Sequence, residues 1–367
     1  MGYSKCIEGG KVVASDTCLE PWNVLRIQAG GNCYFCTPAF SKVKYSLGNI
    51  LTDDFDDIWN GETARRVRED VYKNIYSYCK TNLCCKVMYK DNKNVLNVPD
   101  DDDIYVAKPP KQIYFAFDYT CSQSCVFCRD SIIKFPKEEN ELYFNAINKK
   151  IMPYINQCCE IEMNGIGEFI DSPYIGSFIK KAVEVNPEIK FSLISNGLNF
   201  TKENIEKLGL ENRITDIKIS LHSATQNTYK KIFRQDNFQK VIKNLEYISS
   251  LKAENKIKAF SLMFVICSLN YKEIPEFCDF AAKYGAIPAF SCLNNTSTVY
   301  TLKMPDSYPF DCNSIYYNDF VKIMQDKRID KYRHLLSAEL TNLKKNTFFK
   351  SSQNLILYYL RKHKIKI

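Results

Sequence analysis

The chain has 367 residues, of which 45% are hydrophobic, and it carries 16 cysteines and a formal net charge of +8. This length and hydrophobic content allow two domains with a sizeable core and exclude wholesale disorder. No apolar run reaches the roughly 18 residues of a membrane span, and the N-terminus lacks the apolar core of a secretory signal. We therefore expect a cytoplasmic protein without a membrane span.

The cysteines and the charge narrow the class of function. In a reducing cytosol, clustered cysteines indicate metal binding or catalysis rather than disulfides. The positive charge is spread along predicted helices, and only the C-terminal RKHKIKI is a dense basic run. We interpret most of this charge as solvated helix faces, so a nucleic-acid partner is not expected. An anionic partner for the tail stays open as the alternative.

The N-terminal part is rich in cysteine and poor in strand patterns. Residues 17–90 contain one predicted helix, over 53–70, and five cysteines after Cys18. A segment this small and rich in loops predicts a metal site that supports its core. The acidic run PDDDDIY and the following AKPPK then predict a linker, because like charges repel and paired prolines fit neither helix nor central strand.

Strand-like and helical patterns alternate after the linker. The predicted strands lie at 112–120, 160–168, 189–197, 216–223, 259–267 and 286–293. Six strand–helix units predict a parallel sheet with right-handed crossovers, and they are too few for a complete eight-stranded barrel. The predicted fold is therefore α/β, a partial (β/α)6 TIM-like barrel. In such sheets ligands bind beyond the carboxyl ends of the strands.

Three cysteines follow the first of these strands in FDYTCSQSCVFCRD, with the spacing Cys121-x3-Cys125-x2-Cys128. A structural zinc site needs four ligands, whereas three thiolates leave one coordination position open. The triplet resembles that of the radical S-adenosylmethionine (radical SAM) enzymes. The resemblance implies a [4Fe–4S] cluster held by three thiolates, with SAM bound to the fourth iron. Zinc with a distant fourth ligand is the alternative.

The resemblance extends along the predicted strand ends. It implies that an aromatic residue lies beside the adenine, that a glycine–glutamate turn contacts the SAM amino group, and that polar groups hold the ribose and carboxylate. The residues that match are Phe127, Gly165, Gly167, Glu168, Ser195, Ser220, Arg234 and Asn270. His222 is a weak candidate for a general base, and a packing role is equally compatible with the sequence.

The N-terminal cysteines form a second informative set. Cys18 before Pro21-Trp22, the Gly31-x4-Cys36 turn, and Cys79 with Cys84 resemble a SPASM or twitch module. The resemblance implies an auxiliary [4Fe–4S] cluster on Cys18, Cys36, Cys79 and Cys84, with Cys33 or Cys85 as possible substitutes. Zinc is again the alternative. In most relatives this module follows the barrel, so whether its cluster faces the barrel mouth is open here.

The resulting hypothesis is a radical SAM enzyme of the oxidoreductase type. It would cleave SAM reductively to a 5′-deoxyadenosyl radical that takes hydrogen from a peptide or protein, with a flavodoxin or ferredoxin as electron donor. A carbohydrate or small-molecule substrate is the first alternative, and a non-catalytic metal-binding module is the second. The predicted domains are an auxiliary module (1–98), a linker (99–111), the barrel (112–300) and a helical extension (301–367).

Overall fold

The computed structural model describes residues 12–13, 18–38, 41, 45–80, 84, 96–97, 104–163, 167–293, 308–336 and 340. None of the helices in these ranges has the length and apolar character needed to cross a membrane. The chain packs as two compact units. The first comprises Met1–Cys121, Lys134–Leu193 and Ile205–Ile214, and the second comprises Ser122–Ile133, Ile194–Asn204 and Thr215–Ile367.

The first unit contains a mixed sheet in the order β8-β7-β6-β2-β3-β4. Its strands are β2 (Val24–Gln28), β3 (Asn32–Tyr34), β4 (Gly48–Asn49), β6 (Gln112–Ala116), β7 (Glu160–Met163) and β8 (Lys190–Ser195). The strands β2, β6, β7 and β8 run parallel, whereas β3 and β4 are antiparallel to their neighbours. A separate antiparallel pair joins β1 (Val12–Val13) and β5 (Leu96–Asn97).

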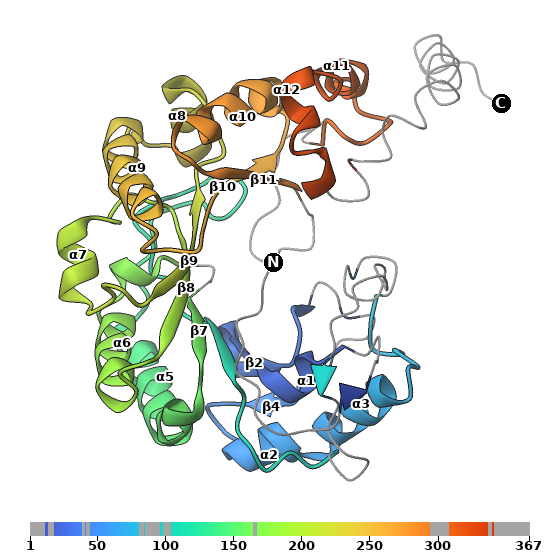
Figure 1. Cartoon of the computed structure of the whole chain (residues 1–367), viewed down its shortest axis with the longest axis vertical. Coiled ribbons are helices and arrows are strands. Elements are labelled where there is room, and N and C mark those ends of the chain that lie inside the picture. The colour runs from blue at the N-terminus through green and yellow to red at the C-terminus, as the bar shows by residue number, and fades with distance from the viewer. Residues whose placement is uncertain are drawn as a thin grey trace. The chain divides into compact units, whose positions relative to one another are not determined.

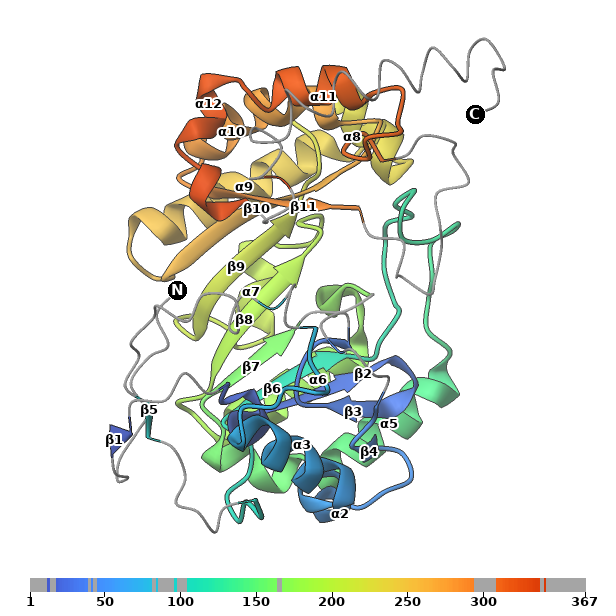
Figure 2. The same ribbon diagram turned by 90° about the vertical axis from the view of Figure 1, so that its right-hand side faces the viewer.

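The N-terminal segment contributes directly to this sheet through β2. Val24 pairs with Gln112 and Gln28 pairs with Ala116, so β2 lies in register along the whole of β6 (Figure 2). Because the two strands are parallel, their carboxyl ends lie at the same edge of the sheet. The cysteine-rich segment and the first predicted barrel strand are therefore parts of one sheet.

The two faces of this sheet differ in polarity. One face is apolar and is covered by helices: Phe115 contacts Phe178, with ring centres 4.8 Å apart, and Phe117 stacks on Tyr143 at 5.0 Å. These contacts come from α6 (Pro173–Val185) and α5 (Lys137–Lys150), which lie beside β7 in Figure 1. Since side chains alternate along a strand, the intervening residues face the other way. They form a polar cross-strand row of Arg26, Tyr114, Glu162 and Ser192.

Glycine divides the helix that the sequence predicts over 53–70. The structure has α2 (Phe55–Asn60) and α3 (Glu62–Tyr72) instead, after the short α1 (Glu20–Asn23). At Gly61 the backbone leaves the helical conformation, and an added Cβ would lie 2.1 Å from the carbonyl oxygen of Asp57. The single-helix prediction is therefore wrong, because the turn between the two helices leaves no room for a side chain at this position.

A buried arginine ties α3 to its surroundings. The Nε of Arg68 donates to the carbonyl of Pro21 at 2.9 Å, and Nη1 donates to the carbonyl of Ile104 at 3.1 Å. Its guanidinium lies over the rings of Phe35 and Trp59, at 4.9 and 4.7 Å. Burial lowers the pKa of Arg68 to about 9, which still leaves it charged at neutral pH. Cation–π contacts and carbonyl acceptors thus stabilise this buried charge.

The second unit continues the strand–helix alternation. Its parallel strands follow the order β11-β10-β9. They are β9 (Ile214–Ser220), β10 (Ala259–Ile266) and β11 (Ile287–Cys292). The helices are α8 (Gln226–Phe233), α9 (Phe238–Ala253), α10 (Ile274–Lys283), α11 (Tyr317–Ile323) and α12 (Lys327–Asp330), and α7 (Lys202–Lys207) has residues in both units. Together the units contain all six predicted parallel strands, β6 to β11, which confirms the α/β prediction.

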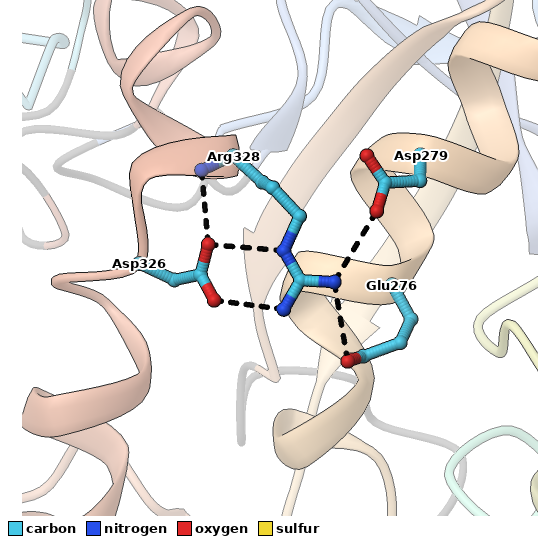
Figure 3. A network of polar contacts seen from close by, with 4 residues as sticks. All are labelled: Glu276, Asp279, Asp326 and Arg328. Atoms are coloured by element: carbon cyan, nitrogen blue, oxygen red, sulfur yellow. Dashed lines mark hydrogen bonds and ion pairs between the residues drawn. The ribbon is translucent and has the colours of Figure 1, made fainter.

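An ion-pair network joins α12 to α10 (Figure 3). Arg328 makes a two-point contact with Asp326, through Nε at 3.0 Å and Nη2 at 2.8 Å. Its Nη1 also reaches Glu276 at 3.3 Å and Asp279 at 3.2 Å. Hydrogen bonds from the side chain and backbone of Arg328 lower the pKa of Asp326 to about 2.

We expect Asp326→Asn to lower the free energy of unfolding by about 1 kcal/mol at pH 7, the scale of a partly exposed pair with a helix-cap bond. A lowered native pKa stabilises the fold above the ordinary aspartate pKa of about 4, and this contribution is lost as the pH falls toward 2. Thermal unfolding at pH 7 and pH 3 should therefore show a difference from wild type that shrinks in acid. Glu254→Gln, which changes an exposed carboxylate beside Lys256, is the control. A difference that grows in acid would contradict the assignment.

Candidate functional site

The cysteine loop between β6 and α5 is bound to α8 within the second unit. The amide of Val126 donates to the carbonyl of Ile232 at 2.9 Å. The side-chain amide of Gln123 donates to the hydroxyl of Tyr229, also at 2.9 Å, and both side chains are fully buried. These bonds fix the backbone on both sides of Cys125.

The turn after α8 adds two further anchors. Gln235 donates from Nε2 to the carbonyl of Ser122 at 2.9 Å. Arg234 ends α8 in the left-handed conformation, with φ of 58°, and donates from Nη1 to the carbonyls of Arg129 and Asp130 at 3.3 and 3.1 Å. Arg234 therefore braces the end of the cysteine loop. Its predicted contact with a SAM carboxylate stays a prediction.

None of the three loop cysteines forms a disulfide within the described residues. Cys121 is buried at the end of a segment of the first unit, and Cys125 and Cys128 are half-buried in the second. Within the described ranges, no three histidine, cysteine or acidic side chains form a ready metal-ligand set. The donor chemistry nevertheless fits a thiolate-bound cluster, because the buried guanidinium of Arg129 donates to the sulfur of Cys128 at 3.5 Å.

The glycine–glutamate turn after β7 packs against the segment that leads to Cys121. The amide of Glu168 donates to the carbonyl of Thr120 at 2.7 Å. A Cβ on Gly167 would lie 2.0 Å from the carbonyl oxygen of Asp118, so only glycine allows this approach. Gly165 lies outside the described residues. The observed contacts thus place Gly167 and Glu168 beside the entry to the cysteine loop.

The remaining predicted SAM contacts belong to the second unit. Ser195 accepts a bond from the amide of Gly197 at 3.0 Å. Asn270 accepts from the amide of Cys267 at 2.8 Å and donates to the carbonyl of His222 at 2.9 Å. Ser220 ends β9, and its hydroxyl lies 4.0 Å from the sulfur of Met263. Ser195 and Asn270 therefore have local structural roles, and their contacts with SAM stay predictions.

His222 is fully enclosed and supports an aromatic residue of the cysteine loop. Its Nδ1 accepts a hydrogen bond from the amide of Val265 at 3.1 Å, and burial lowers its pKa to about 3. The ring makes an edge contact with Phe127 at 5.0 Å and stacks on Phe233 at 5.8 Å. Because the ring is neutral and its Nδ1 already accepts a hydrogen bond, the geometry supports a packing role for His222. The general-base role of His222 stays a prediction without geometric support.

Three N-terminal cysteines of the first unit, Cys18, Cys36 and Cys79, lie close enough to Tyr45 to affect its pKa. Burial, followed by the nearby charges of Cys36 and Cys84, raises the pKa of Cys79 to about 11. Burial also raises the pKa of Tyr45, and Cys36, Cys79 and Cys18 add to the effect. Cys18, Cys36, Cys79 and Cys84 form no disulfide within the described residues, and their thiolates have the chemistry that a zinc or iron–sulfur centre requires.

Cys33 is separated from these four thiols. It pairs across the sheet with Ile27, which follows Arg26 in β2. Its side chain therefore lies on the opposite face of the sheet from the polar row. Its thiol is buried, donates to the carbonyl of Gly31 at 3.5 Å, and has a pKa that burial raises to about 12. These contacts describe a core residue, so the geometry favours Cys36 over Cys33 as the ligand. Cys85 lies outside the described residues.

Cys36 and Cys121 lie toward opposite ends of the paired strands β2 and β6. Tyr34 pairs with Arg26, and because β3 runs antiparallel to β2, Cys36 lies toward the amino end of β2. Cys121 instead follows the carboxyl end of β6. The five residues of β6 span about 13 Å, at 3.3 Å for each of four steps. Along the sheet, Cys36 is thus about one strand length from the end of β6 that leads to Cys121.

Two family models match segments of the chain. Residues 117–281 match the model of the radical SAM superfamily, and residues 18–86 match the model of the SPASM iron–sulfur cluster-binding domain. The chain carries a SPASM domain followed by a radical SAM domain. This confirms the predicted recognition, including the N-terminal position of the auxiliary module. The radical SAM domain is a site for a [4Fe–4S] cluster with SAM, and the SPASM domain is a site for an auxiliary cluster.

Solved structures show only distant likeness. The structure of TYW1 with a lysine-pyruvate adduct is 18% identical, with a TM-score of 0.38, and covers 58% of this chain and 72% of that chain. Streptococcus suis SuiB bound to S-adenosylmethionine is 13% identical, with a TM-score of 0.41, and covers 81% and 70%. TsrM from Kitasatospora setae is 11% identical, with a TM-score of 0.36, and covers 54% and 37%. No curated protein sequence matches the chain.

We expect Gly167→Ala to impair cluster binding by the radical SAM domain. The added methyl group collides with the carbonyls before Cys121, so the loop must move and about four irons per chain should be lost. Iron analysis after anaerobic reconstitution measures the loss. Gly176→Ala is the control, because its methyl group meets only the mobile end of Leu208 at 3.1 Å. Full iron content in Gly167→Ala would contradict the close-approach argument.

Tyr229→Phe tests the bond between α8 and the cysteine loop. The change leaves the buried amide of Gln123 without its acceptor, which should cost about 1–3 kcal/mol of unfolding free energy in urea. The matched control is Tyr174→Phe, which removes an exposed hydroxyl 3.2 Å from Glu141. Equal stability of the two variants would show that the Gln123–Tyr229 bond does not anchor the loop.

Proposed function

We propose that this chain is a radical SAM enzyme that modifies a peptide or protein by a hydrogen-abstraction reaction of the oxidoreductase type. The observation that carries the proposal is the Cys121-Cys125-Cys128 triplet on a loop that follows a parallel strand and is fixed by α8. The SPASM match supports the substrate class, since peptides and proteins are the substrates that the resemblance implies. A carbohydrate or small molecule is the second candidate class.

Bound at the triplet, a [4Fe–4S] cluster with SAM supplies a 5′-deoxyadenosyl radical that can take hydrogen from an unactivated carbon. The chain's residues hold and orient the partners. The three thiolates are the cluster ligands, and Arg129 places positive charge at the sulfur of Cys128. His222 and Phe233 support Phe127, which is proposed to lie beside the adenine. Burial lowers the pKa of His222 to about 3, so the ring that contacts Phe127 is uncharged at neutral pH.

The SPASM domain is proposed to transfer electrons. Its four candidate thiolates fill the coordination of a cluster, which leaves no open iron for a substrate. The position of Cys36 toward the amino end of β2, away from the strand end that leads to Cys121, also argues against direct substrate binding. A flavodoxin or ferredoxin is the proposed donor to the cluster with SAM, and the cytoplasm is the proposed location.

SAM cleavage tests the proposal directly. We expect anaerobically reconstituted protein to form 5′-deoxyadenosine from SAM and dithionite, and a substrate peptide should raise this rate. Cys125→Ala should abolish product formation, because two thiolates do not hold the cluster in place. Stimulation by a sugar rather than a peptide would favour the second candidate class. Absence of 5′-deoxyadenosine from iron-loaded protein would refute the enzyme assignment.

Metal analysis tests the two-cluster assignment. We expect about eight irons and eight sulfides per chain, from four of each in two [4Fe–4S] centres. Replacing the three loop cysteines by alanine should leave about four irons, those of the auxiliary centre. Replacing Cys18, Cys36, Cys79 and Cys84 by alanine should also leave about four irons, those of the cluster at the loop triplet. One zinc with about four irons in the unmodified protein would show that the SPASM cysteines hold zinc instead.

A further inference from the structure

A buried ion pair borders the SPASM cysteines. Arg26 projects from the polar face of the sheet, where its guanidinium carbon lies 3.6 Å from the ring centre of Tyr114. Its Nη2 lies 3.3 Å from Oε2 of Glu20, and the two side chains are only 12% and 8% exposed. The stacking and the ion pair fix the guanidinium in one position.

Each member of this pair is close to a candidate cluster ligand. Arg26 pairs across the sheet with Tyr34, and Cys36 follows two residues later, where diagonal neighbours on one face are about 7–8 Å apart. Electrostatics agree with this placement: burial lowers the pKa of Arg26, but Glu20, Tyr114 and Cys36 raise it more. Glu20 in turn is two residues from Cys18.

The Nε of Arg26 is a buried donor with no hydrogen-bond partner among the described residues. A buried N–H of a charged group is costly to leave without an acceptor. Cluster sulfurs and thiolates accept such bonds, and these bonds help to set the reduction potential of iron–sulfur centres. A sulfur at the diagonal position of Cys36 is therefore a candidate acceptor for this donor.

We propose that the Glu20–Arg26 pair sets the reduction potential of the auxiliary centre, with Arg26 donating from Nε to a sulfur at Cys36. This inference rests on the proposed auxiliary cluster. Reduction adds an electron to the centre, so a nearby positive charge favours the reduced form and a nearby carboxylate opposes it. The pair is buried, so solvent and salt screen these charges weakly. Arg26 and Glu20 are positioning residues with opposite effects.

The test is an EPR-monitored redox titration of the auxiliary centre alone. The background protein carries Cys121→Ala, Cys125→Ala and Cys128→Ala, so the remaining reconstituted iron belongs to the SPASM domain. Arg26→Met should shift the midpoint potential to a more negative value. Glu20→Gln should shift it to a more positive value.

Two further variants sharpen the result. Arg26→Lys keeps the charge but loses the Nε donor, so its negative shift should be smaller than that of Arg26→Met. If Arg26→Met does not fold, Arg26→Lys and Glu20→Gln still give the opposite signs. Arg66→Met is the matched control, because Arg66 is an exposed α3 residue paired with Glu62, and its potential should equal that of the background.

Unchanged potentials in Arg26→Met and Glu20→Gln, or shifts of the same sign, would overturn the inference while leaving the cluster assignment intact. Zinc in place of iron in the background protein would instead refute the auxiliary cluster, and with it the role of the pair. Metal analysis of the same samples separates these two failures.

Discussion

The parallel pairing of β2 with β6 is the constraint on which the rest of the first unit depends. It brings a strand of the SPASM domain into the same sheet as β6, β7 and β8. The shared register also fixes where the chemistry lies. The segment leading to Cys121 leaves β6 at the carboxyl edge, whereas Cys36 lies toward the amino end of β2. The separation of Cys36 from the segment that leads to Cys121 is therefore a property of the sheet.

Polar side chains stabilise the surroundings of both cysteine sets. Around the loop, Gln123, Arg234 and Gln235 use directed hydrogen bonds to fix backbone that has no regular secondary structure. In the SPASM domain, Arg68 and the Glu20–Arg26 pair place charge inside the fold. Such groups are costly unless they are satisfied, so they favour one arrangement over alternatives. The Glu20–Arg26 pair is also the one that we propose to act on the auxiliary centre.

The sequence predicted what depends on local pattern. Six strand–helix repeats and the cysteine triplet were readable because periodicity and spacing are local signals. The strand β2 was missed, because VLRIQ is short and its pairing partner lies almost 90 residues away, from Val24 to Gln112. The division of 53–70 at Gly61 depends on a contact with Asp57 that residue type alone does not reveal. The bracing role of Arg234 was hidden in the same way, since its acceptors are backbone carbonyls about 100 residues earlier.

Amide hydrogen exchange of the intact protein tests the shared sheet most directly. If β2 and β6 are one structural element, the amides of Val24–Gln28 that bond to β6 should be protected to the same degree as those of Gln112–Ala116, and both should open together in mild denaturant. Rapid exchange throughout β2, with β6 still protected, would contradict this account. It would mean that the SPASM domain is only tethered to the radical SAM domain.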